Sequence, residues 1–209
     1  MGVTTQTFNF LNQWINPNIN SIGEFGDQQF LSCSLFQEKS FTRTYWVNKG
    51  IEYDSMDIHG HGKTILFNLN KDNPITKQYD VLTDIGTFEH VRNFYMALKN
   101  MHQLCKINGM MIHILPAFGH WPNHGPWRTK IPFWYKLGKA NSYKIRAVHE
   151  EKTYIGGYNS DQIYIVYEKI KETQFVSEED FNTFGLIQAY EFEDYEEGKI
   201  REENKSLYK

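Results

Sequence analysis

Apolar and polar positions follow their clearest pattern between Lys77 and Pro116. A short apolar run at residues 81–85 predicts a buried strand, and a second apolar run, which ends at Pro116, predicts another. Between them, six apolar residues recur at i, i+3, i+4, i+7, i+10 and i+11, which is one face of a helix. They are Phe94, Ala97, Leu98, Met101, Leu104 and Cys105. The pair Asn108-Gly109 is typical of a left-handed stop, so we predict that the helix ends there.

This order of strand, helix and strand predicts a βαβ unit, whose strands are parallel and covered on both faces. Ligands of such sheets bind outside the carboxyl ends of the strands. Glu89 and His90 lie in the polar turn after the first strand, and Pro116 ends the second. We therefore expect Glu89, His90 and the residues after Pro116 to lie at a ligand-binding edge.

The first 20 residues carry apolar side chains at helical spacing, which predicts a short packing helix. Residues 20–25 predict a strand, followed by a turn at Gly26 and by an apolar, helix-compatible pattern at residues 30–36. A glycine in such a turn lets the backbone approach a ligand, and the first amides of the following helix face the same place. The apolar positions of the N-terminal helix are Phe8, Leu11, Trp14 and Ile15.

Residues 52–58 predict a second strand that carries Asp57 near its end, and residues 65–69 predict a short third strand. An acid at the end of the second strand is where α/β nucleotide folds hold the ribose hydroxyls, usually about 20 residues after the glycine turn. Asp57 follows Gly26 by about 30 residues, a separation that still permits this role.

The sequence HGHGKT after Asp57 invites two interpretations that the residues do not support. A phosphate loop needs a glycine five residues before Gly62, and that position is Asp57. His59 and His61 lack a third ligand close by, so we interpret them as turn residues rather than as metal ligands.

The segment after Pro116 combines prolines, aromatic rings and histidines. Aromatic walls with a few polar groups are typical of small-molecule pockets, and the segment follows a strand end. The competing interpretation is a surface loop whose rings only pack against the protein. The residues concerned are His120, Trp121, His124 and Trp127.

Two further runs, residues 143–149 and 162–167, predict an antiparallel strand pair at a sheet edge. Residues 168–209 carry twelve acidic and six basic side chains, and we expect their last part to be a solvated helix or a disordered end. The predicted organisation is one domain, residues 1–209, with an N-terminal helix (1–20), a core (20–170) and an acidic C-terminal extension (171–209).

Composition narrows the classes of function. With 209 residues, 40% hydrophobic and 22% charged, the chain has the composition of one globular domain. A net charge of −3 makes nucleic acid an unexpected partner, although six lysines and arginines occur between Trp121 and Ala147 without an acid. That basic, aromatic stretch favours an anionic or ring-bearing substrate.

Cysteine usage and hydropathy predict the compartment. Cys33 and Cys105 form no redox or metal motif, and no charged, apolar leader opens the chain. No apolar run reaches the length of about 20 residues that a membrane helix needs. We therefore expect a cytoplasmic protein that does not span a membrane.

The order of these segments resembles that of the class I S-adenosylmethionine-dependent methyltransferases over residues 20–170. Four segments carry the resemblance: SIGEFG at residues 21–26; Asp57; YDVLTD at 79–84 with FEHV at 88–91; and residues 104–116, with Lys106, Gly109 and a terminal proline. The resemblance implies a Rossmann-like three-layer αβα sandwich, with a mostly parallel sheet and an antiparallel C-terminal strand pair. It also implies S-adenosyl-L-methionine as the cofactor.

By this resemblance we assign seven residues to the cofactor pocket; their structural alternative is to cap strand ends and form turns. They are Glu24, Gly26, Asp27, Asp57, Asn68, Leu69 and Asp84. The glycine loop departs from the family pattern, because Gln28 and Phe30 stand where two further glycines are usual. Asn68 stands where many members have an acid near the adenine. These departures bear on whether the loop still supports turnover.

Methyl transfer from a sulfonium is an in-line displacement, so it depends on alignment and, when the nucleophile carries a proton, on a base. Histidine is the natural base near neutral pH. His120 and His124 are the first candidates, with Glu89 and His90 at the border of the site, whereas His113, within a strand, is interpreted as a core residue. Some family members bind a divalent ion through acids and histidines, but here only Glu89 and His90 of such a set are present, so no metal is expected.

The leading hypothesis is O-methylation of a sugar hydroxyl or of another small molecule. One alternative is a catalytically inactive, methyltransferase-like binding or scaffold protein. A nicotinamide-dependent oxidoreductase is disfavoured, because the fingerprint Gly-x-Gly-x-x-Gly is absent. Neither the oligomeric state nor the atom that is methylated follows from the sequence.

Overall fold

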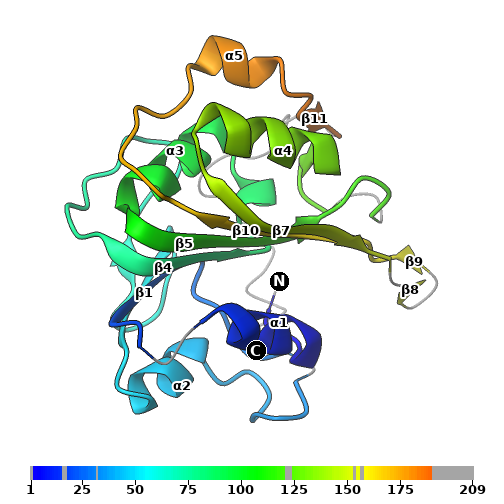
Figure 1. Cartoon of the computed structure of the whole chain (residues 1–209). Helices are drawn as coiled ribbons and strands as arrows, with labels where there is room; N and C mark the ends of the chain where they lie inside the picture. Colours follow the sequence, from blue (N-terminus) through cyan, green and yellow to red (C-terminus); the bar gives the residue numbers. More distant parts are fainter. Residues whose placement is uncertain are drawn as a thin grey trace.

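A seven-stranded sheet with helices on both faces organises the computed structural model, which describes residues 2–15, 18–31, 33–120, 124–152, 154–155 and 158–189 (Figure 1). The strands are β1 (Ser21–Phe25), β2 (Glu52–Asp57), β3 (Ile65–Leu66), β4 (Tyr79–Ile85), β5 (Cys105–Pro116), β6 (Trp127–Arg128), β7 (Lys144–Glu151), β8 (Tyr154–Ile155), β9 (Tyr158–Asn159), β10 (Gln162–Glu168) and β11 (Ile187–Gln188). The helices are α1 (Thr5–Trp14), α2 (Thr42–Asn48), the 3₁₀ turn η1 (Phe88–His90), α3 (Phe94–Leu104), α4 (Ile131–Ala140) and α5 (Glu178–Asn182).

The strand order is β3-β2-β1-β4-β5-β10-β7. The first five strands in this order are parallel, and β10 is antiparallel to both of its neighbours, β5 and β7. Pro116 of β5, Gln162 of β10 and Glu151 of β7 lie in one row, which marks the carboxyl edge of the sheet on this side. The mostly parallel sheet with an antiparallel C-terminal strand pair is confirmed.

The alternation of side chains along the central strands separates two cores. Val81 and Ile112 face α1 and α2, whereas Leu82 and Met111 face α3 and α4. Figure 1 shows the same division, with α1 and α2 on one side of the sheet and α3, α4 and α5 on the other. Because both faces are covered, the central strands bury side chains on both sides, as parallel sheets require. The three-layer αβα architecture is therefore confirmed.

The βαβ unit is present as β4, α3 and β5, but its helix ends earlier than predicted. The Asn93 side chain caps the start of α3 by accepting a hydrogen bond from the Met96 amide at 2.9 Å. The helix ends at Leu104, and Cys105 already pairs with Tyr79 of β4. Asn108 does have a positive φ of 64°, but it lies within β5 near an irregularity of the strand pairing. The prediction of a helix stop at this asparagine was wrong, because strand pairing of the buried Cys105 takes over first.

The helix predicted at residues 30–36 is also absent among the described residues of that segment. Phe30 exchanges backbone hydrogen bonds with residues 39 and 40, and the next helix, α2, begins at Thr42. The rings of Phe30 and Phe36 stack with their centroids 4.0 Å apart, in contact with Phe8 of α1. A loop that folds back thus buries Phe30 and Cys33 and leaves Leu35 exposed. The spacing of apolar residues alone does not distinguish this loop from a helix.

The C-terminal segment packs on the layer of α3 and α4 as far as it is described. Phe175 and Phe181 are buried there, and β11 pairs with β6. Residues 190–209, to which the prediction of a solvated helix or disordered end applies, lie outside the described residues. In the described part of the chain, no helix is both long and apolar enough to cross a bilayer.

Candidate functional site

A cavity of about 500 Å³ lies at the carboxyl ends of β1, β2 and β4. Its volume is within the range of small-molecule sites, about 300–1,000 Å³. The turn after each of these three strands contributes to its wall, as expected for a ligand site in an open α/β sheet. The lining residues are Gly26, Asp27, Gln28, Gln29, Leu31, Lys39, Asp57, His59, Gly60, His61, Gly86, Thr87 and His90.

The turn after β1 depends on Gly26. Its φ of +85° is left-handed, and a Cβ at this position would lie 2.5 Å from Thr87 Oγ1 and 2.6 Å from Gln28 Nε2. The Gln28 amide donates to the Ile85 carbonyl at 3.0 Å and lies 3.2 Å from Thr87 Oγ1. Gln28, at a position where the family pattern has glycine, therefore ties the turn after β1 to the end of β4.

Two acids on the cavity wall are already oriented by hydrogen bonds. Asp57 accepts from the amides of Asp27 (3.0 Å) and His59 (2.8 Å), one on each carboxylate oxygen. Each oxygen keeps a second lone pair, so Asp57 can still accept from a ligand hydroxyl. The Asp27 carboxylate is held by Arg43 at 2.7 Å and by the His61 amide at 3.0 Å.

The other four residues of the predicted cofactor set do not line the cavity. Glu24 is buried and accepts hydrogen bonds from the Gln28 amide and the Thr42 hydroxyl. Burial raises the pKa of Glu24 to about 7, against the hydrogen bonds that lower it. Asn68 accepts from the Asn70 amide, and Leu69 belongs to the core.

Asp84, the remaining member, is buried beneath η1 beside His113. Its Oδ2 lies 3.0 Å from His113 Nδ1, and its Oδ1 accepts from the Thr87 and Phe88 amides. Burial raises the pKa of Asp84 well above its usual value and lowers that of His113 to about 3, so the pair holds one proton between them. Asp84 thus caps the turn that carries Glu89, and His113 is a core residue that supports it.

The four predicted catalytic residues come together next to this turn. Glu89 Oε1 lies 3.6 Å from Nε2 of both His90 and His124. The rings of His90 and His124 have centroids 5.3 Å apart, and the His120 ring lies 4.9 Å from that of His124. Glu89 and His90 come from η1, whereas His120 and His124 come from the segment after β5, so the two loops converge at the carboxyl edge.

The protonation of these groups follows from burial and from their neighbours. Burial lowers the pKa of His120, whose Nδ1 donates to the Asp161 carbonyl at 2.8 Å. Burial also lowers the pKa of His90, more than the attraction of Glu89 raises it. For Glu89 itself burial favours the neutral form, but the neighbouring His90 and His124 outweigh burial and lower its pKa. These shifts favour an ionised Glu89 carboxylate and unprotonated rings of His90 and His120 at neutral pH.

Gly125 and Arg128 hold the loop that carries His124. A Cβ on Gly125, whose φ is +71°, would lie 2.7 Å from the Glu89 carbonyl oxygen and 2.9 Å from Glu89 Cγ. This close approach brings His124 beside the Glu89 side chain. The buried Arg128 donates to the carbonyls of His124, Gly125 and Trp127, which fastens the loop from below.

The rest of the aromatic segment packs rather than lines the cavity. The Trp127 indole donates to the Val91 carbonyl, and its ring packs against Phe94. Trp121 lies outside the described residues. Of the basic side chains in this stretch, Arg128 binds its own loop and Arg146 pairs with Glu168 at 2.6 Å. No described residue of the basic stretch lines the 500 Å³ cavity.

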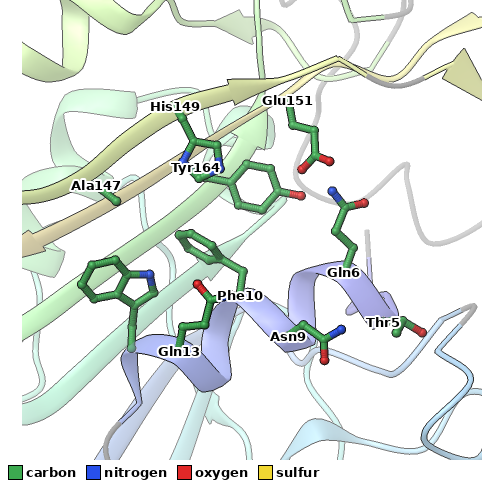
Figure 2. A pocket seen from close by; sticks show the side chains of 10 residues that line it. Thr5, Gln6, Asn9, Phe10, Gln13, Ala147, His149, Glu151 and Tyr164 are labelled. Carbon is green, nitrogen blue, oxygen red and sulfur yellow. The ribbon is translucent and has the colours of Figure 1, made fainter.

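A second hollow, of about 730 Å³, lies between α1 and the strands β7 and β10. Figure 2 shows the amides of Gln6, Asn9 and Gln13 on one side of it, with His149 and Glu151 on the other. The His149 ring stacks on that of Tyr164 at 5.0 Å and 1°, and Phe10 contacts both. Glu151 ends β7 in the row of Pro116, so one end of the hollow lies at the carboxyl edge.

No protein-family model and no curated protein matches the sequence. Solved structures do match the fold. They include the 1,6-didemethyltoxoflavin-N1-methyltransferase of Burkholderia thailandensis with bound 1,6-didemethyltoxoflavin and S-adenosylhomocysteine (11% identity, 72% of this chain and 71% of that chain, TM-score 0.50). The N-methyltransferase NodS of Bradyrhizobium japonicum WM9, in complex with S-adenosylhomocysteine, matches at 8% identity over 80% of this chain and 89% of that chain, with a TM-score of 0.54. StiE O-MT residues 961–1257 match at 12% identity over 85% of this chain and 77% of that chain, with a TM-score of 0.54.

The chain has the fold of the class I S-adenosylmethionine-dependent methyltransferases. The fold implied by the sequence resemblance is thereby confirmed. Within this methyltransferase fold, the cavity brings together Gly26, Asp27 and Asp57 of the predicted cofactor set with His90 of the predicted catalytic set.

Sequence reasoning missed two groups of residues around these cavities. His59 and His61, interpreted as turn residues, lie on the wall of the first cavity. Helix α1, predicted as a packing helix, places the amides of Gln6, Asn9 and Gln13 in the second hollow. Their spacing of i, i+3 and i+7 puts them on one helix face, and this is the signal that could have indicated it.

Proposed function

We propose that this protein is an S-adenosyl-L-methionine-dependent methyltransferase of a small molecule, and that it methylates an oxygen, with a sugar hydroxyl as the leading candidate. The observation that carries the proposal is the cavity at the carboxyl ends of β1, β2 and β4, with Asp57 on its wall, in a chain with the methyltransferase fold. Neighbours with this fold include an N-methyltransferase and StiE O-MT.

The residues of the cavity fit the cofactor. The left-handed turn at Gly26 leaves backbone open to a ligand, and Asp57 is fixed by two amides while keeping lone pairs for a pair of ribose hydroxyls. The cofactor would supply the methyl group. Glu24 and Asp84, which do not reach the cavity, then support this site by holding the turns after β1 and β4.

The acceptor would enter from the side of the histidines and the second hollow. Aromatic rings with convergent amides and a carboxylate suit a ring-bearing, hydroxyl-rich molecule, since the rings pack on its apolar face and the polar groups fix its hydroxyls. The hollow supplies the rings of Phe10 and Tyr164, the amides of Gln6 and Gln13, and the carboxylate of Glu151 (Figure 2).

A hydroxyl nucleophile must lose a proton, and His120 or His124 is the proposed base. His120 is the better placed for proton acceptance, because its Nδ1 donates to the Asp161 carbonyl and so leaves the proton-accepting form at Nε2. Most of the remaining work is alignment, which the two fastened loops provide.

Calorimetric titration with S-adenosylmethionine and S-adenosylhomocysteine tests the proposal. We expect both to bind, and we expect Asp57→Asn to weaken S-adenosylhomocysteine binding by about 10–100-fold, the range for a charged hydrogen bond. Asp54→Asn is the matched control, since Asp54 is an acid of the same strand that does not line the cavity. It should bind like the unmodified protein. Absence of heat with either ligand would overturn the enzyme hypothesis and leave the alternative of a binding or scaffold protein.

The atom that is methylated needs a separate measurement. Incubation with S-adenosylmethionine and a panel of nucleotide-linked sugars, glycans and small amines, followed by mass spectrometry, reports both turnover and position. A product methylated on oxygen supports the O-methyltransferase proposal. A product methylated only on nitrogen would refute that part of it while retaining the methyltransferase.

A further inference from the structure

We propose that Glu89, His90 and His124 form a binding site for a divalent transition-metal ion of the Zn²⁺ type. The site does not require S-adenosylmethionine, so it stands or falls independently of the proposed function. It departs from the expectation of no metal, because the third ligand comes from a different loop, 34 residues further along the chain.

The separations of the ligand atoms fit a single ion. One carboxylate oxygen of Glu89 and one ring nitrogen of each histidine lie within 4.8 Å of one another. Glu89 Oε1 lies 3.6 Å from Nε2 of His90 and 3.6 Å from Nε2 of His124. Ligands about 2.0–2.2 Å from a tetrahedral ion lie about 3.3–3.6 Å apart. Both contacts of Glu89 therefore already have nearly the spacing of a bound ion, and the two imidazole nitrogens lie within 4.8 Å of each other.

The buried carboxylate supplies the second, independent observation. Glu89 is 1% exposed, and neither of its side-chain oxygens has a hydrogen-bond partner among the described residues. A buried carboxylate without donors is costly, and buried charges in proteins are paired or coordinate metals. An ion between Glu89 and the two imidazoles would satisfy the oxygen that now faces two ring nitrogens.

The surrounding structure holds the ligands in place before an ion binds. Asp84 caps η1 through the Thr87 and Phe88 amides, and this turn carries two of the ligands. Gly125 packs on the Glu89 backbone, and Arg128 fastens the carbonyl of His124. Metal sites need such supporting contacts, since they fix the orientation of the ligands.

The donor set decides the kind of ion. Two imidazoles and one carboxylate suit zinc and related transition metals, whereas magnesium and calcium prefer all-oxygen ligands. Three protein ligands leave a fourth position for water or for an oxygen of the acceptor, as in catalytic rather than structural zinc sites. His90 also lines the cavity, so an ion bound to it would adjoin that space. With His124 as a ligand, the base of the proposed reaction would be His120.

Titration of the metal-free, full-length protein with ZnCl₂, followed by calorimetry in the absence of S-adenosylmethionine, tests the site. We expect one ion per chain, and a Co²⁺ complex with the intense visible absorption of tetrahedral coordination. Glu89→Gln and His124→Ala should each weaken Zn²⁺ binding by more than about 100-fold, since even partners outside the coordination sphere cost about 10–100-fold. His59→Ala, which removes an imidazole from the wall of the same cavity, should leave the affinity unchanged.

Two results would overturn the site. One is the absence of stoichiometric Zn²⁺ binding by the unmodified protein. The other is an affinity of Glu89→Gln and His124→Ala for Zn²⁺ that equals that of the unmodified protein. Circular dichroism checks that each variant is folded. Should Glu89→Gln not fold, His90→Ala takes its place, because the His90 side chain is 34% exposed and its loss leaves little of the core open. Retained Zn²⁺ affinity in a folded His90→Ala variant would contradict the proposal equally.

Discussion

The loops after β1 and after β4 lie at the same edge of the sheet, but their carboxylates differ in hydrogen bonding. After β1, Gln28 stands where the family pattern has a glycine. Its Nε2 donates a hydrogen bond to the Ile85 carbonyl, whereas its Oε1 has no hydrogen-bond partner among the described residues. The carboxylates of Glu24 in β1, Asp27 in the loop and Asp57 at the end of β2 all accept hydrogen bonds around this loop. After β4, by contrast, the buried Glu89 has no hydrogen bond to its carboxylate among the described residues.

The difference separates a region whose carboxylates are satisfied within the protein from one that leaves a buried carboxylate without a hydrogen bond among the described residues. A carboxylate that accepts hydrogen bonds within the protein needs no ligand to satisfy it. A buried carboxylate that faces only ring nitrogens costs stability, and such costs are concentrated at functional sites. The carboxylates around the β1 loop thus accept hydrogen bonds within the protein, whereas the β4 loop carries a carboxylate that accepts none among the described residues.

The largest expected effect concerns Glu24, whose contribution to the free energy of unfolding depends on pH. Since burial raises the pKa of Glu24 to about 7, its contribution is favourable below pH 4.5 and is lost as the pH rises through 7. The loss should reach about 3 kcal/mol between about pH 4.5 and pH 8, from 1.36 kcal/mol per unit of pKa. Glu24→Gln removes this dependence. The change in the free energy of unfolding between the two pH values, measured with urea, should therefore be about 3 kcal/mol smaller in the variant than in the unmodified protein. Glu38→Gln, a change of an exposed glutamate, is the control. The same pH-dependent change in the free energy of unfolding in the unmodified protein and in both variants would contradict the prediction.

The next effect breaks the convergence of the two loops. Gly125→Ala combines a left-handed φ of +71° with a contact of 2.7 Å to the Glu89 carbonyl, and should lower the free energy of unfolding by about 2 kcal/mol. Gly50→Ala is matched, because Gly50 has a φ of +79° with no atom within 4 Å of the added Cβ. It should cost only about 1 kcal/mol. Thermal denaturation measures both, and equal losses would show that the contact with Glu89 is unimportant.

The smallest effect tests whether Gln28 narrows the cofactor side. Gln28→Ala removes the amide that donates to Ile85 and frees the space beside Gly26, so stability should fall by about 1 kcal/mol. S-adenosylhomocysteine should bind about fivefold more tightly, a change worth about 1 kcal/mol. Calorimetry measures the affinity, with the exposed Gln37→Ala as control. Weaker binding by the Gln28 variant would instead make this side chain part of the site.

Sequence patterns predicted the sheet and most of its elements because their signals are local. The face of α3 and the apolar runs of β4 and β5 follow directly from periodicity. The segment at residues 30–36 failed because ring stacking between Phe30 and Phe36 competes with helix formation, and spacing does not reveal it. The placement of His124 beside Glu89 depends on a glycine contact between two loops, which only the folded chain displays.

The candidate site was predictable as a list of residues and less so as a geometry. Gly26, Asp27, Asp57 and His90 do meet at one cavity. Glu24 and Asp84 are acids, as ligand contacts often are, but both are buried, and each accepts a hydrogen bond from an amide of the turn that follows its strand. The second hollow has contributions from α1, β7 and β10, which are far apart in sequence, so no single segment could indicate it.

The place of β10 in the sheet has a consequence for how the chain is made. β10 inserts between β5 and β7, and pairs Glu168 with Met110 and Gln162 with Pro116. A growing polypeptide that has not yet reached residue 162 therefore carries β5 with one open edge, on which another chain could add a strand. Pairing of strands that are far apart in the sequence is slow, so the protein should be most prone to aggregate during synthesis, before β10 has emerged from the ribosome.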